Sequence, residues 1–207
     1  MIRVKVCGIT NLEDALAAAE MGADALGFVL ASSPRQVSPE DLRHLVAELP
    51  PLIVKVGVFV DSPLDEVRQI MSDCGLNLAQ LHGSESPEYC EALFPRAIKA
   101  FQVKDATVLR QLPQYRASAY LLDGYHSKLK GGSGQSFDWE IARQARGSDR
   151  IILSGGLTPE NVARAIAIAK PYGVDVSSGV EVRPGKKDHD KLAAFIQAVK
   201  ESKIEAA

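Results

Sequence analysis

Paired cysteines are missing from this chain of 207 residues. Its three cysteines, Cys7, Cys74 and Cys90, are odd in number, far apart and without C-x-x-C spacing. This pattern predicts neither a disulfide framework nor a zinc site, and we expect no bound metal. Unpaired cysteines are typical of a reducing compartment, so the sequence favours the cytoplasm.

Long apolar runs and an excess of charge are also missing. No stretch approaches the roughly 20 apolar residues of a membrane span, and the first residues lack the layout of a signal peptide. We therefore expect a protein that is neither secreted nor anchored in a membrane. The formal net charge of -2 offers no overall attraction to nucleic acid or anionic lipid, so an anionic ligand must be held by local groups.

A repeat of apolar runs and amphipathic segments organises the chain. The apolar, β-rich runs cover residues 4–7, 25–30, 53–60, 78–81, 98–101, 119–123, 151–154 and 174–177. Each is followed by a segment with helical periodicity, which is the pattern of parallel strands joined by helices. Eight strands and eight helices without a linker predict an α/β protein with a single domain over residues 1–207. We expect a closed (β/α)8 TIM barrel, with residues 201–207 as a frayed tail.

Helix boundaries are marked by capping residues and glycines. Serine or threonine that can cap a helix precedes five of the expected helices, and two glycines stand where helices should stop. The expected caps are Thr10, Ser38, Ser62, Ser86 and Thr158, and the expected stops are Gly22 and Gly75. An open doubly wound sheet is the alternative fold. It would usually carry a glycine-rich phosphate turn after the first strand, and residues 7–10 (CGIT) are not such a turn.

Two reactive side chains stand at strand ends, which form the active face of a barrel. Cys7 ends the first strand, where it is either a small buried residue or a base or nucleophile. To act as a base near neutral pH the thiol needs a lowered pKa, and no histidine lies beside it in the sequence. Asp123 ends the sixth strand, where a partly desolvated carboxyl suits a general acid.

Three further side chains on the same face are candidates for substrate contacts. Arg35, in the loop after the second strand, has a planar fork that suits a carboxylate. His82, after the fourth strand, is a substrate-lining or structural residue, and no second histidine stands at metal-ligand spacing. Asp175, in the eighth strand region, contacts substrate hydroxyls or satisfies polar groups of the barrel.

The loops after the seventh and eighth strands predict a phosphate site. Gly155 and Gly156 let backbone N–H groups approach an anion, and a short helix is expected to begin near Ser178. The residues of this site are Gly155, Gly156, Ser177, Ser178 and Gly179. A glycine-rich segment at 131–134 lacks the spacing of a nucleotide P-loop, and it is either a mobile cover or a plain flexible loop.

Taken together, the segments resemble the phosphoribosylanthranilate isomerase family of tryptophan biosynthesis. The matching segments are 5–10 (KVCGIT), 33–37 (SPRQV), 56–60 (VGVFV), 80–83 (QLHG), 121–123 (LLD), 131–134 (GGSG) with 137–139 (FDW), 153–157 (LSGGL) and 173–181 (GVDVSSGVE). The resemblance implies a (β/α)8 enzyme that converts N-(5-phosphoribosyl)anthranilate to 1-(2-carboxyphenylamino)-1-deoxyribulose 5-phosphate by an Amadori rearrangement.

The resemblance also implies a role for each candidate residue. Asp123 would be the general acid at the ribose ring oxygen, and Cys7 the general base that removes the C2 proton. Arg35 would hold the anthranilate carboxylate, the glycine and serine loops the phosphate, and Asp175 would face the amine and hydroxyls. The family needs no cofactor, takes a small phosphosugar, and leaves a monomer or a homodimer open.

Two departures from the family pattern occur, and two other functions compete. Gly124 follows the acid and residues 181–184 vary beyond the phosphate loop, and we expect neither to touch a residue with assigned chemistry.

A histidine-pathway or dual-specificity phosphoribosyl isomerase is the first alternative function. It is disfavoured because the histidine-pathway family is typified by a site with two aspartates and by a substrate with a phosphate at each end. A non-catalytic phosphosugar-binding barrel is disfavoured because binding alone needs no acid and base.

Overall fold

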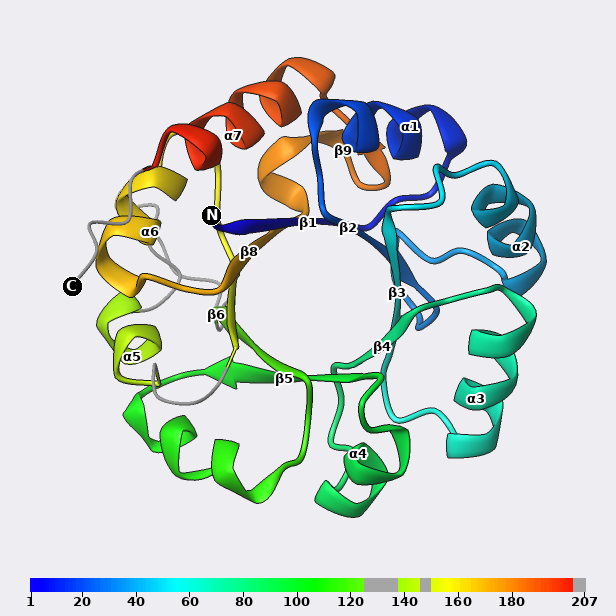
Figure 1. The fold of residues 1–207 in the computed structure, drawn as a ribbon, viewed down its shortest axis with the longest axis horizontal. Coiled ribbons are helices and arrows are strands. Elements are labelled where there is room, and N and C mark those ends of the chain that lie inside the picture. Colours follow the sequence, from blue (N-terminus) through cyan, green and yellow to red (C-terminus); the bar gives the residue numbers. More distant parts are fainter. Residues whose placement is uncertain (125–137, 146–149, 203–207) are drawn as a thin grey trace.

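Eight parallel strands close into a barrel with helices around it (Figure 1). The structure, a computed structural model, describes residues 1–124, 138–145 and 150–202. The strands are β1 Arg3–Cys7, β2 Ala25–Val29, β3 Val54–Phe59, β4 Leu78–Leu81, β5 Ala97–Val103, β6 Ala119–Gly124, β7 Ile151–Ser154 and β8 Gly173–Val176. Because β8 pairs with β1, the sheet has no open edge. The predicted TIM barrel is confirmed, and the open doubly wound sheet is excluded.

The alternation of side chains along each strand decides what faces the inside of the barrel. Val4 and Val6 of β1 pack in the layer between the barrel and its helices, so Lys5 and Cys7 face inward. The same rule turns Asp175 of β8 inward, because its neighbours pack in the outer layer. Polar side chains thereby gather inside the barrel near the carboxyl ends of its strands.

Apolar residues fill the rest of the barrel interior. They are Val56, Ile98, Ala100, Ala119, Leu121 and Ile152, all buried. A larger buried cluster joins the outer faces of the strands to the helices. This packing makes the strands a rigid support for the side chains at their ends.

The helices among the described residues are one fewer than predicted. They are α1 Leu12–Met21, α2 Pro39–Ala47, α3 Leu64–Asp73, α4 Pro87–Leu93, α5 Trp139–Gln144, α6 Val162–Ala169 and α7 His189–Glu201. Between β5 and β6 the chain forms two 3-10 helices, η1 Ala106–Arg110 and η2 Leu112–Gln114, in place of an α-helix. Pro113 lies at the start of η2 and lacks the N–H that would continue an α-helix.

Some of the predicted helix boundaries are confirmed. Ser38 and Ser86 cap α2 and α4 by accepting hydrogen bonds from backbone N–H groups of the first turn. Gly22 caps the end of α1 with a φ of 104°. Gly75, with a φ of 63°, directly follows the C-cap residue of α3. Both glycines occupy the left-handed region that other residues avoid.

Three of the predicted caps are wrong. Asn11, not Thr10, caps α1, because its side chain accepts from the N–H of Asp14. Ser62 does not cap α3, whose N-cap position is taken by proline with no side-chain bond. Thr158 does not cap α6 either, since that helix begins only at Val162 after an intervening turn.

A small hairpin that the sequence analysis did not predict follows β8. A 3-10 helix, η3 Ser178–Val180, leads into the antiparallel strands β9 Glu181–Arg183 and β10 Lys186–Lys187. Gly185 makes the turn with a φ of 81°. The hairpin lies at the end of the barrel beside β1 (Figure 1), and it connects the predicted phosphate loop to α7.

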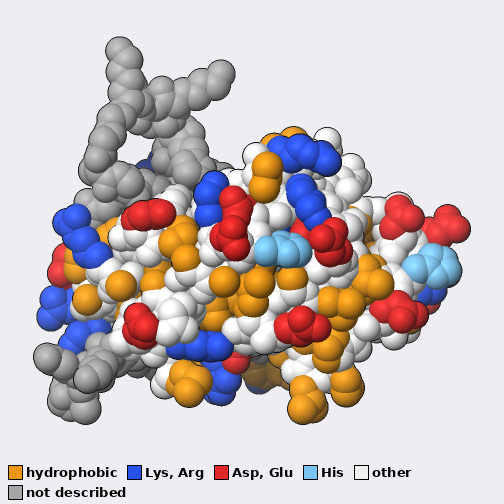
Figure 2. Space-filling view, turned by 90° about the horizontal axis from the view of Figure 1, so that it is seen from above, with side chains coloured by type: hydrophobic (Ala, Val, Ile, Leu, Met, Phe, Trp, Pro, Cys, Tyr) orange, Lys and Arg blue, Asp and Glu red, His pale blue; other side chains and the backbone are white. Residues whose placement is uncertain are grey.

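Some expectations fall on residues that the structure does not describe. The glycine-rich segment 131–134 lies outside the described residues, as does most of the tail, while Glu201 still belongs to α7. Among the described helices, none has the length and apolar character needed to cross a membrane. On the face shown in Figure 2, basic and acidic side chains are interspersed, which is consistent with the small net charge.

Candidate active site

One cavity at the carboxyl end of the barrel brings the predicted site residues together. It has a volume of about 400 Å³. All of the predicted catalytic, substrate-binding and phosphate-binding residues line it: Cys7, Arg35, His82, Asp123, Gly155, Gly156, Asp175, Ser177, Ser178 and Gly179. They come from six different strands or the loops after them, and only the closed barrel makes them neighbours.

The Cys7 thiol is buried at the end of β1, and a glycine makes room for it. A Cβ on Gly27 of the neighbouring strand β2 would lie 2.7 Å from the Cys7 sulfur and 2.8 Å from Lys5 Nζ. Any side chain at position 27 would displace both groups. The thiol and the Lys5 ammonium therefore share one small space inside the barrel.

A buried ion pair lies beside the thiol. Lys5 Nζ is 2.8 Å from Asp175 Oδ1, and the two side chains are only 5% and 6% exposed. Ser154 of β7 donates a hydrogen bond to the other oxygen of Asp175 at 3.0 Å. Because both charges are paired and hydrogen-bonded, the barrel can hold them out of water. Cys7, Lys5, Asp175 and Ser154 are called the base wall below.

Burial raises the pKa of the Cys7 thiol, and the nearby Lys5 ammonium opposes this rise. The expected lowering of this pKa is therefore not found. The pKa of Lys5 is itself raised, because Asp175 and Cys7 outweigh the desolvation that would lower it. Lys5 thus stays charged. It supplies the positive charge beside Cys7 for which no neighbouring histidine is present in the sequence.

The part of the cavity lined by β6 and the end of β4 is more open. Asp123 near the end of β6 and His82 after β4 are 22% and 23% exposed, and His82 Nε2 lies 3.3 Å from Asp123 Oδ2. His82 Nδ1 also pairs with the amide of Gln80 at 2.9 Å. Asp123, His82 and Gln80 are called the acid wall below. The Asp123 and His82 side chains are therefore partly accessible to solvent at the cavity.

A glycine also makes room for the carboxyl group of Asp123. Gly155 has a φ of 86°, and a Cβ there would lie 2.7 Å from Asp123 Oδ1. The same Cβ would collide with the backbone of Gly124. The expectation that Gly124 touches no residue of the site is therefore wrong, since its backbone packs directly on the Gly155 loop.

Arg35 reaches the cavity from the loop after β2 and is held by a carboxylate. Its Nε lies 2.8 Å from Glu181 Oε1, and its Nη2 lies 2.6 Å from Glu181 Oε2. Glu181 in turn lies 3.0 Å from Lys187 Nζ. The expectation that residues 181–184 touch no assigned residue is wrong here as well, because β9 lies beside β1 in space.

The two predicted phosphate loops pack tightly on one another. Gly155 and Gly156 both have positive φ angles, of 86° and 66°. A side chain at Gly179 would collide with the carbonyl of Leu157. The three-residue helix η3 begins at Ser178, as predicted. Small residues therefore leave the backbone of both loops accessible from the cavity.

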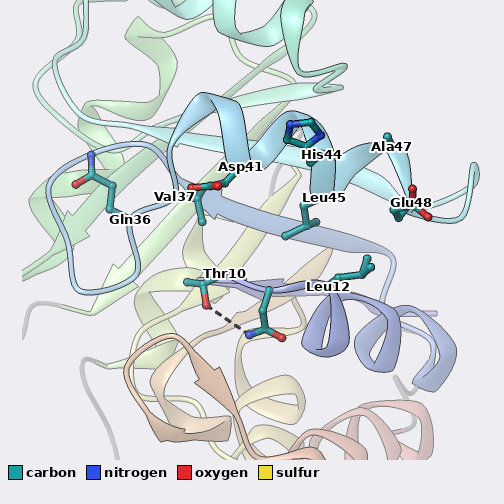
Figure 3. Close-up of a pocket in the computed structure, with 10 residues that line it drawn as sticks. Thr10, Leu12, Gln36, Val37, Asp41, His44, Leu45, Ala47 and Glu48 are labelled. Carbon is teal, nitrogen blue, oxygen red and sulfur yellow. Dashed lines mark hydrogen bonds between the residues drawn. The ribbon is translucent and has the colours of Figure 1, made fainter.

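Another cavity lies on the outside of the barrel between α1 and α2 (Figure 3). Its volume is about 500 Å³, and its lining includes Thr10, Leu12, Asp41 and His44. Its lining comes from the segments after β1 and β2 and from helices α1 and α2, and it includes none of the predicted site residues. Within residues 1–124, 138–145 and 150–202, no group of three or more acidic, histidine or cysteine side chains could hold a metal ion.

Sequence reasoning missed Lys5, Glu181 and Lys187. Lys5 could have been found, because it stands two residues before Cys7 on the same face of a strand. Glu181 contacts Arg35 across 146 residues of sequence, and Lys187 reaches it through a hairpin that no pattern predicted. Only the folded structure brings these two residues beside Arg35.

Comparison with known proteins points to one family. The sequence model of N-(5'phosphoribosyl)anthranilate (PRA) isomerase matches residues 4–198. An N-(5'-phosphoribosyl)anthranilate isomerase of Geobacter sp. (strain M21) is 53% identical over 201 residues, covering 97% of this chain and 98% of that protein. The protein of that name from Pelobacter propionicus is 50% identical over 207 residues, covering 100% of this chain and 99% of its own.

Solved structures give the same result. The crystal structure of phosphoribosyl anthranilate isomerase from Thermotoga maritima superimposes with a TM-score of 0.89 at 45% identity, covering 97% of this chain and 99% of that one. A second isomerase structure, in complex with reduced 1-(o-carboxyphenylamino)-1-deoxyribulose 5-phosphate, has a TM-score of 0.84 at 44% identity, with the same coverage. With its barrel, its cavity and these relatives, the chain belongs to the phosphoribosylanthranilate isomerase family.

Proposed function

We propose that this chain converts N-(5-phosphoribosyl)anthranilate to 1-(2-carboxyphenylamino)-1-deoxyribulose 5-phosphate in tryptophan biosynthesis. The observation that carries the proposal is the single cavity, which is lined by a thiol, a carboxyl group and two groups of residues that can hold anions. An aldose-to-ketose shift requires a proton donor at oxygen and a proton acceptor at carbon.

Asp123 acts as the general acid. It donates a proton to the ribose ring oxygen, the bond between C1 and that oxygen breaks, and the nitrogen lone pair forms a Schiff base at C1. Cys7 as thiolate then removes the C2 proton. The C–H electrons form a C1–C2 double bond and the C1–N π electrons return to nitrogen. Tautomerisation of this enolamine gives the ketone, so electrons balance within the substrate and no cofactor is needed.

Lys5 and Asp175 support this chemistry from the base wall. The Lys5 ammonium opposes the effect of burial on the Cys7 pKa, so it favours the thiolate that must accept the proton. Asp175 lines the cavity and faces the substrate amine and hydroxyls, while its ion pair with Lys5 holds it in place.

The two ends of the substrate are anchored separately. Arg35 binds the anthranilate carboxylate, and the loops at Gly155, Gly156 and Ser177 to Gly179 bind the phosphate. His82 contacts the substrate beside the acid. Two fixed ends hold C2 near the thiol, and such positioning supplies a large part of catalysis in an enzyme with a preformed site.

The setting of the enzyme follows from the same observations. We place it in the cytoplasm as a single-domain protein, since Cys7, Cys74 and Cys90 are all free thiols. Its partner is a small phosphosugar rather than nucleic acid or a membrane. A monomer or a homodimer both fit the proposal, and one related structure is of monomers generated from a dimeric isomerase of Thermotoga maritima.

The direct test is a steady-state assay with phosphoribosylanthranilate generated in place, following the loss of its fluorescence. We expect saturable turnover without any added metal or cofactor. Turnover only of the histidine-pathway aminoaldose substrate would replace this function with the related isomerase. Binding of the reduced product without turnover would leave a phosphosugar-binding barrel.

A further inference from the structure

The contact between Arg35 and Glu181 is side-on and leaves part of the guanidinium free. Glu181 accepts hydrogen bonds from Nε at 2.8 and 3.1 Å and from Nη2 at 2.6 Å. No acceptor among the described residues binds Nη1. The edge formed by Nη1 and the second N–H of Nη2 is therefore available for a second carboxylate, in the bidentate geometry that such groups prefer.

The stem of Arg35 is also fixed. It packs against Gly8, the residue after Cys7, which has a φ of 74°. If Gly8 carried a Cβ, that atom would lie 2.5 Å from Arg35 Cδ. The backbone N–H of Arg35 donates to Ser33 Oγ at 3.1 Å. With its stem against Gly8 and its head on Glu181, the guanidinium has one orientation in the cavity.

Lys187 balances the charge of Glu181. Glu181 is 4% exposed and Lys187 is fully buried, with 3.0 Å between Nζ and Oε1. These two charges cancel, so the cluster keeps the single positive charge of Arg35, whose side chain is 22% exposed at the cavity. The half-buried arginine can thus be held by a carboxylate without losing its attraction for another one.

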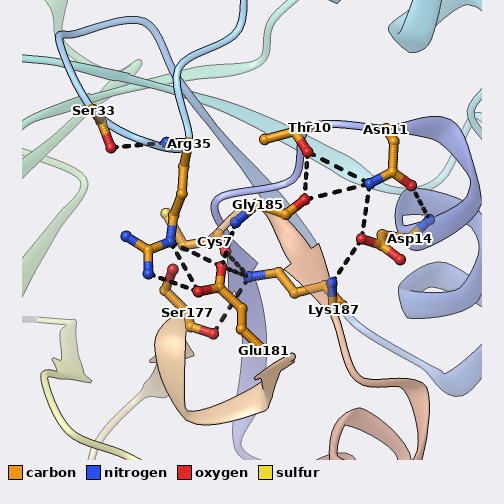
Figure 4. Close-up of polar contacts among 10 residues, drawn as sticks. All are labelled: Cys7, Thr10, Asn11, Asp14, Ser33, Arg35, Ser177, Glu181, Gly185 and Lys187. Atoms are coloured by element: carbon orange, nitrogen blue, oxygen red, sulfur yellow. Dashed lines mark hydrogen bonds and ion pairs between the residues drawn. The ribbon is translucent and has the colours of Figure 1, made fainter. Parts of the chain in front are cut away.

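Lys187 also fixes this cluster to the strand that carries the base. Its Nζ donates to the carbonyl of Cys7 at 2.6 Å, and its backbone N–H donates to the buried carboxylate of Asp14 at 2.8 Å (Figure 4). Asp14 also accepts from Asn11 Nδ2 at 2.8 Å. The hairpin is therefore tied to β1 and α1 on both sides, and Glu181 has little freedom to move.

We propose that Glu181 is the positioning residue that presents Arg35 to the carboxylate of the substrate, and that Lys187 holds Glu181 in place. This inference rests on the proposed function. It assigns to the hairpin a role in specificity, namely the preference for an aromatic amine with an ortho carboxylate over one without it. Glu181 touches no reacting atom and acts through Arg35.

The test compares two ligands on the full chain. One is reduced 1-(2-carboxyphenylamino)-1-deoxyribulose 5-phosphate and the other is the same compound without the carboxylate. By calorimetry, the unsubstituted protein should prefer the carboxylate-bearing ligand by roughly 10- to 100-fold, as expected for a charge-assisted hydrogen-bond pair. In Glu181→Gln this preference should fall by about five-fold or more, because an amide is uncharged and offers one acceptor oxygen in place of the two that Arg35 contacts. The affinity for the ligand without the carboxylate should stay within about two-fold.

Two further variants separate positioning from structure. Glu181→Asp keeps the charge but is too short for the side-on contact, so it should lose the preference as well. Glu85→Gln removes another buried carboxylate, which pairs with Lys99 at 2.7 Å outside the cavity, and it should leave the ratio of the two affinities unchanged. In the assay, the Glu181 variants should raise KM more than they lower kcat.

Each outcome has a defined meaning. If a folded Glu181→Gln or Glu181→Asp keeps the full preference, or if both ligands weaken equally, Glu181 does not position Arg35. In that case the function still stands, provided that Arg35→Ala loses the preference. If the unsubstituted protein binds neither ligand, the proposed function fails and this inference fails with it.

Discussion

The base wall and the acid wall of the cavity differ in how tightly they are held. On the base wall, Lys5 and Asp175 are 5% and 6% exposed and form an ion pair at 2.8 Å. On the acid wall, His82 and Asp123 are 23% and 22% exposed, and a single contact of 3.3 Å joins them. One wall is closed and ion-paired, and the other is half open.

This difference matches the two proton transfers that we propose. A thiol that takes a proton from carbon must be ionised without the help of water, so a buried cation beside it is needed. An acid that protonates an oxygen must regain its proton in every cycle, so access to solvent or to an imidazole helps it. The two walls therefore have opposite requirements, and each can be changed without the other.

The largest effect is expected when the acid is removed and the base wall is left intact. Asp123→Asn keeps the shape of the side chain but cannot supply a proton. Turnover should fall by about 10²- to 10⁴-fold, which is the usual contribution of a general acid. Affinity for the reduced product, measured by calorimetry, should stay nearly unchanged. Turnover close to that of the unsubstituted protein would remove Asp123 from the mechanism.

A smaller effect is expected at Arg35, which belongs to neither wall. Arg35→Ala removes the charge that we propose binds the anthranilate carboxylate, and KM should rise by roughly 10- to 100-fold while kcat changes less. Steady-state kinetics over a range of substrate concentration separates the two constants. An unchanged KM would show that the carboxylate is bound elsewhere.

Removal of the Lys5 ammonium from the base wall should change the pH dependence of turnover. Burial already raises the pKa of Cys7 and Lys5 opposes this rise, so Lys5→Met should raise the pKa further. Because the thiolate is the active form, the acidic limb of kcat should move to higher pH. The loss at neutral pH should be roughly ten-fold and should shrink in alkaline buffer.

The matched control for this experiment is Lys99→Met. Lys99 is also a buried lysine, paired with Glu85 at 2.7 Å, but it lies outside the cavity. Its variant should leave the acidic limb where it was. If the acidic limb of the pH profile moves equally in both variants, or in neither, Lys5 does not control the ionisation of Cys7.

The smallest effect is expected within the acid wall. His82 makes only one long contact with Asp123, so His82→Gln should lower kcat by about two- to ten-fold, the value of a single hydrogen bond. Its pH profile should keep the acidic limb, since that limb belongs to the base wall. A loss of kcat as large as that of Asp123→Asn would indicate that His82, not Asp123, is the general acid.

Much of the two walls could be predicted from the sequence because it depends on local periodicity. The period of two along a strand places Cys7, Asp123 and Asp175 on the inside of the barrel, and the order of the strands places them at one end. The same rule applies to Lys5, which the search for a histidine overlooked. To place these side chains, it is enough to know which residues form a strand and where that strand ends.

The contacts of the hairpin could not be predicted in this way. Glu181 and Arg35 are 146 residues apart, and their contact depends on how β9 and β10 fold back over β1. The two 3-10 helices before β6 were missed for a local reason, since Pro113 lacks the N–H that would continue an α-helix. Only the contacts of the hairpin are settled by packing between distant segments.

The central claim is that the Cys7 thiolate removes the C2 proton, and Cys7→Ser tests it most directly. Serine keeps the size and hydrogen-bonding capacity of the side chain, but its hydroxyl is far less acidic. Turnover of phosphoribosylanthranilate should fall by about 10²- to 10⁴-fold, while calorimetry should give nearly the same affinity for the reduced product. Turnover near that of the unsubstituted protein would contradict the account.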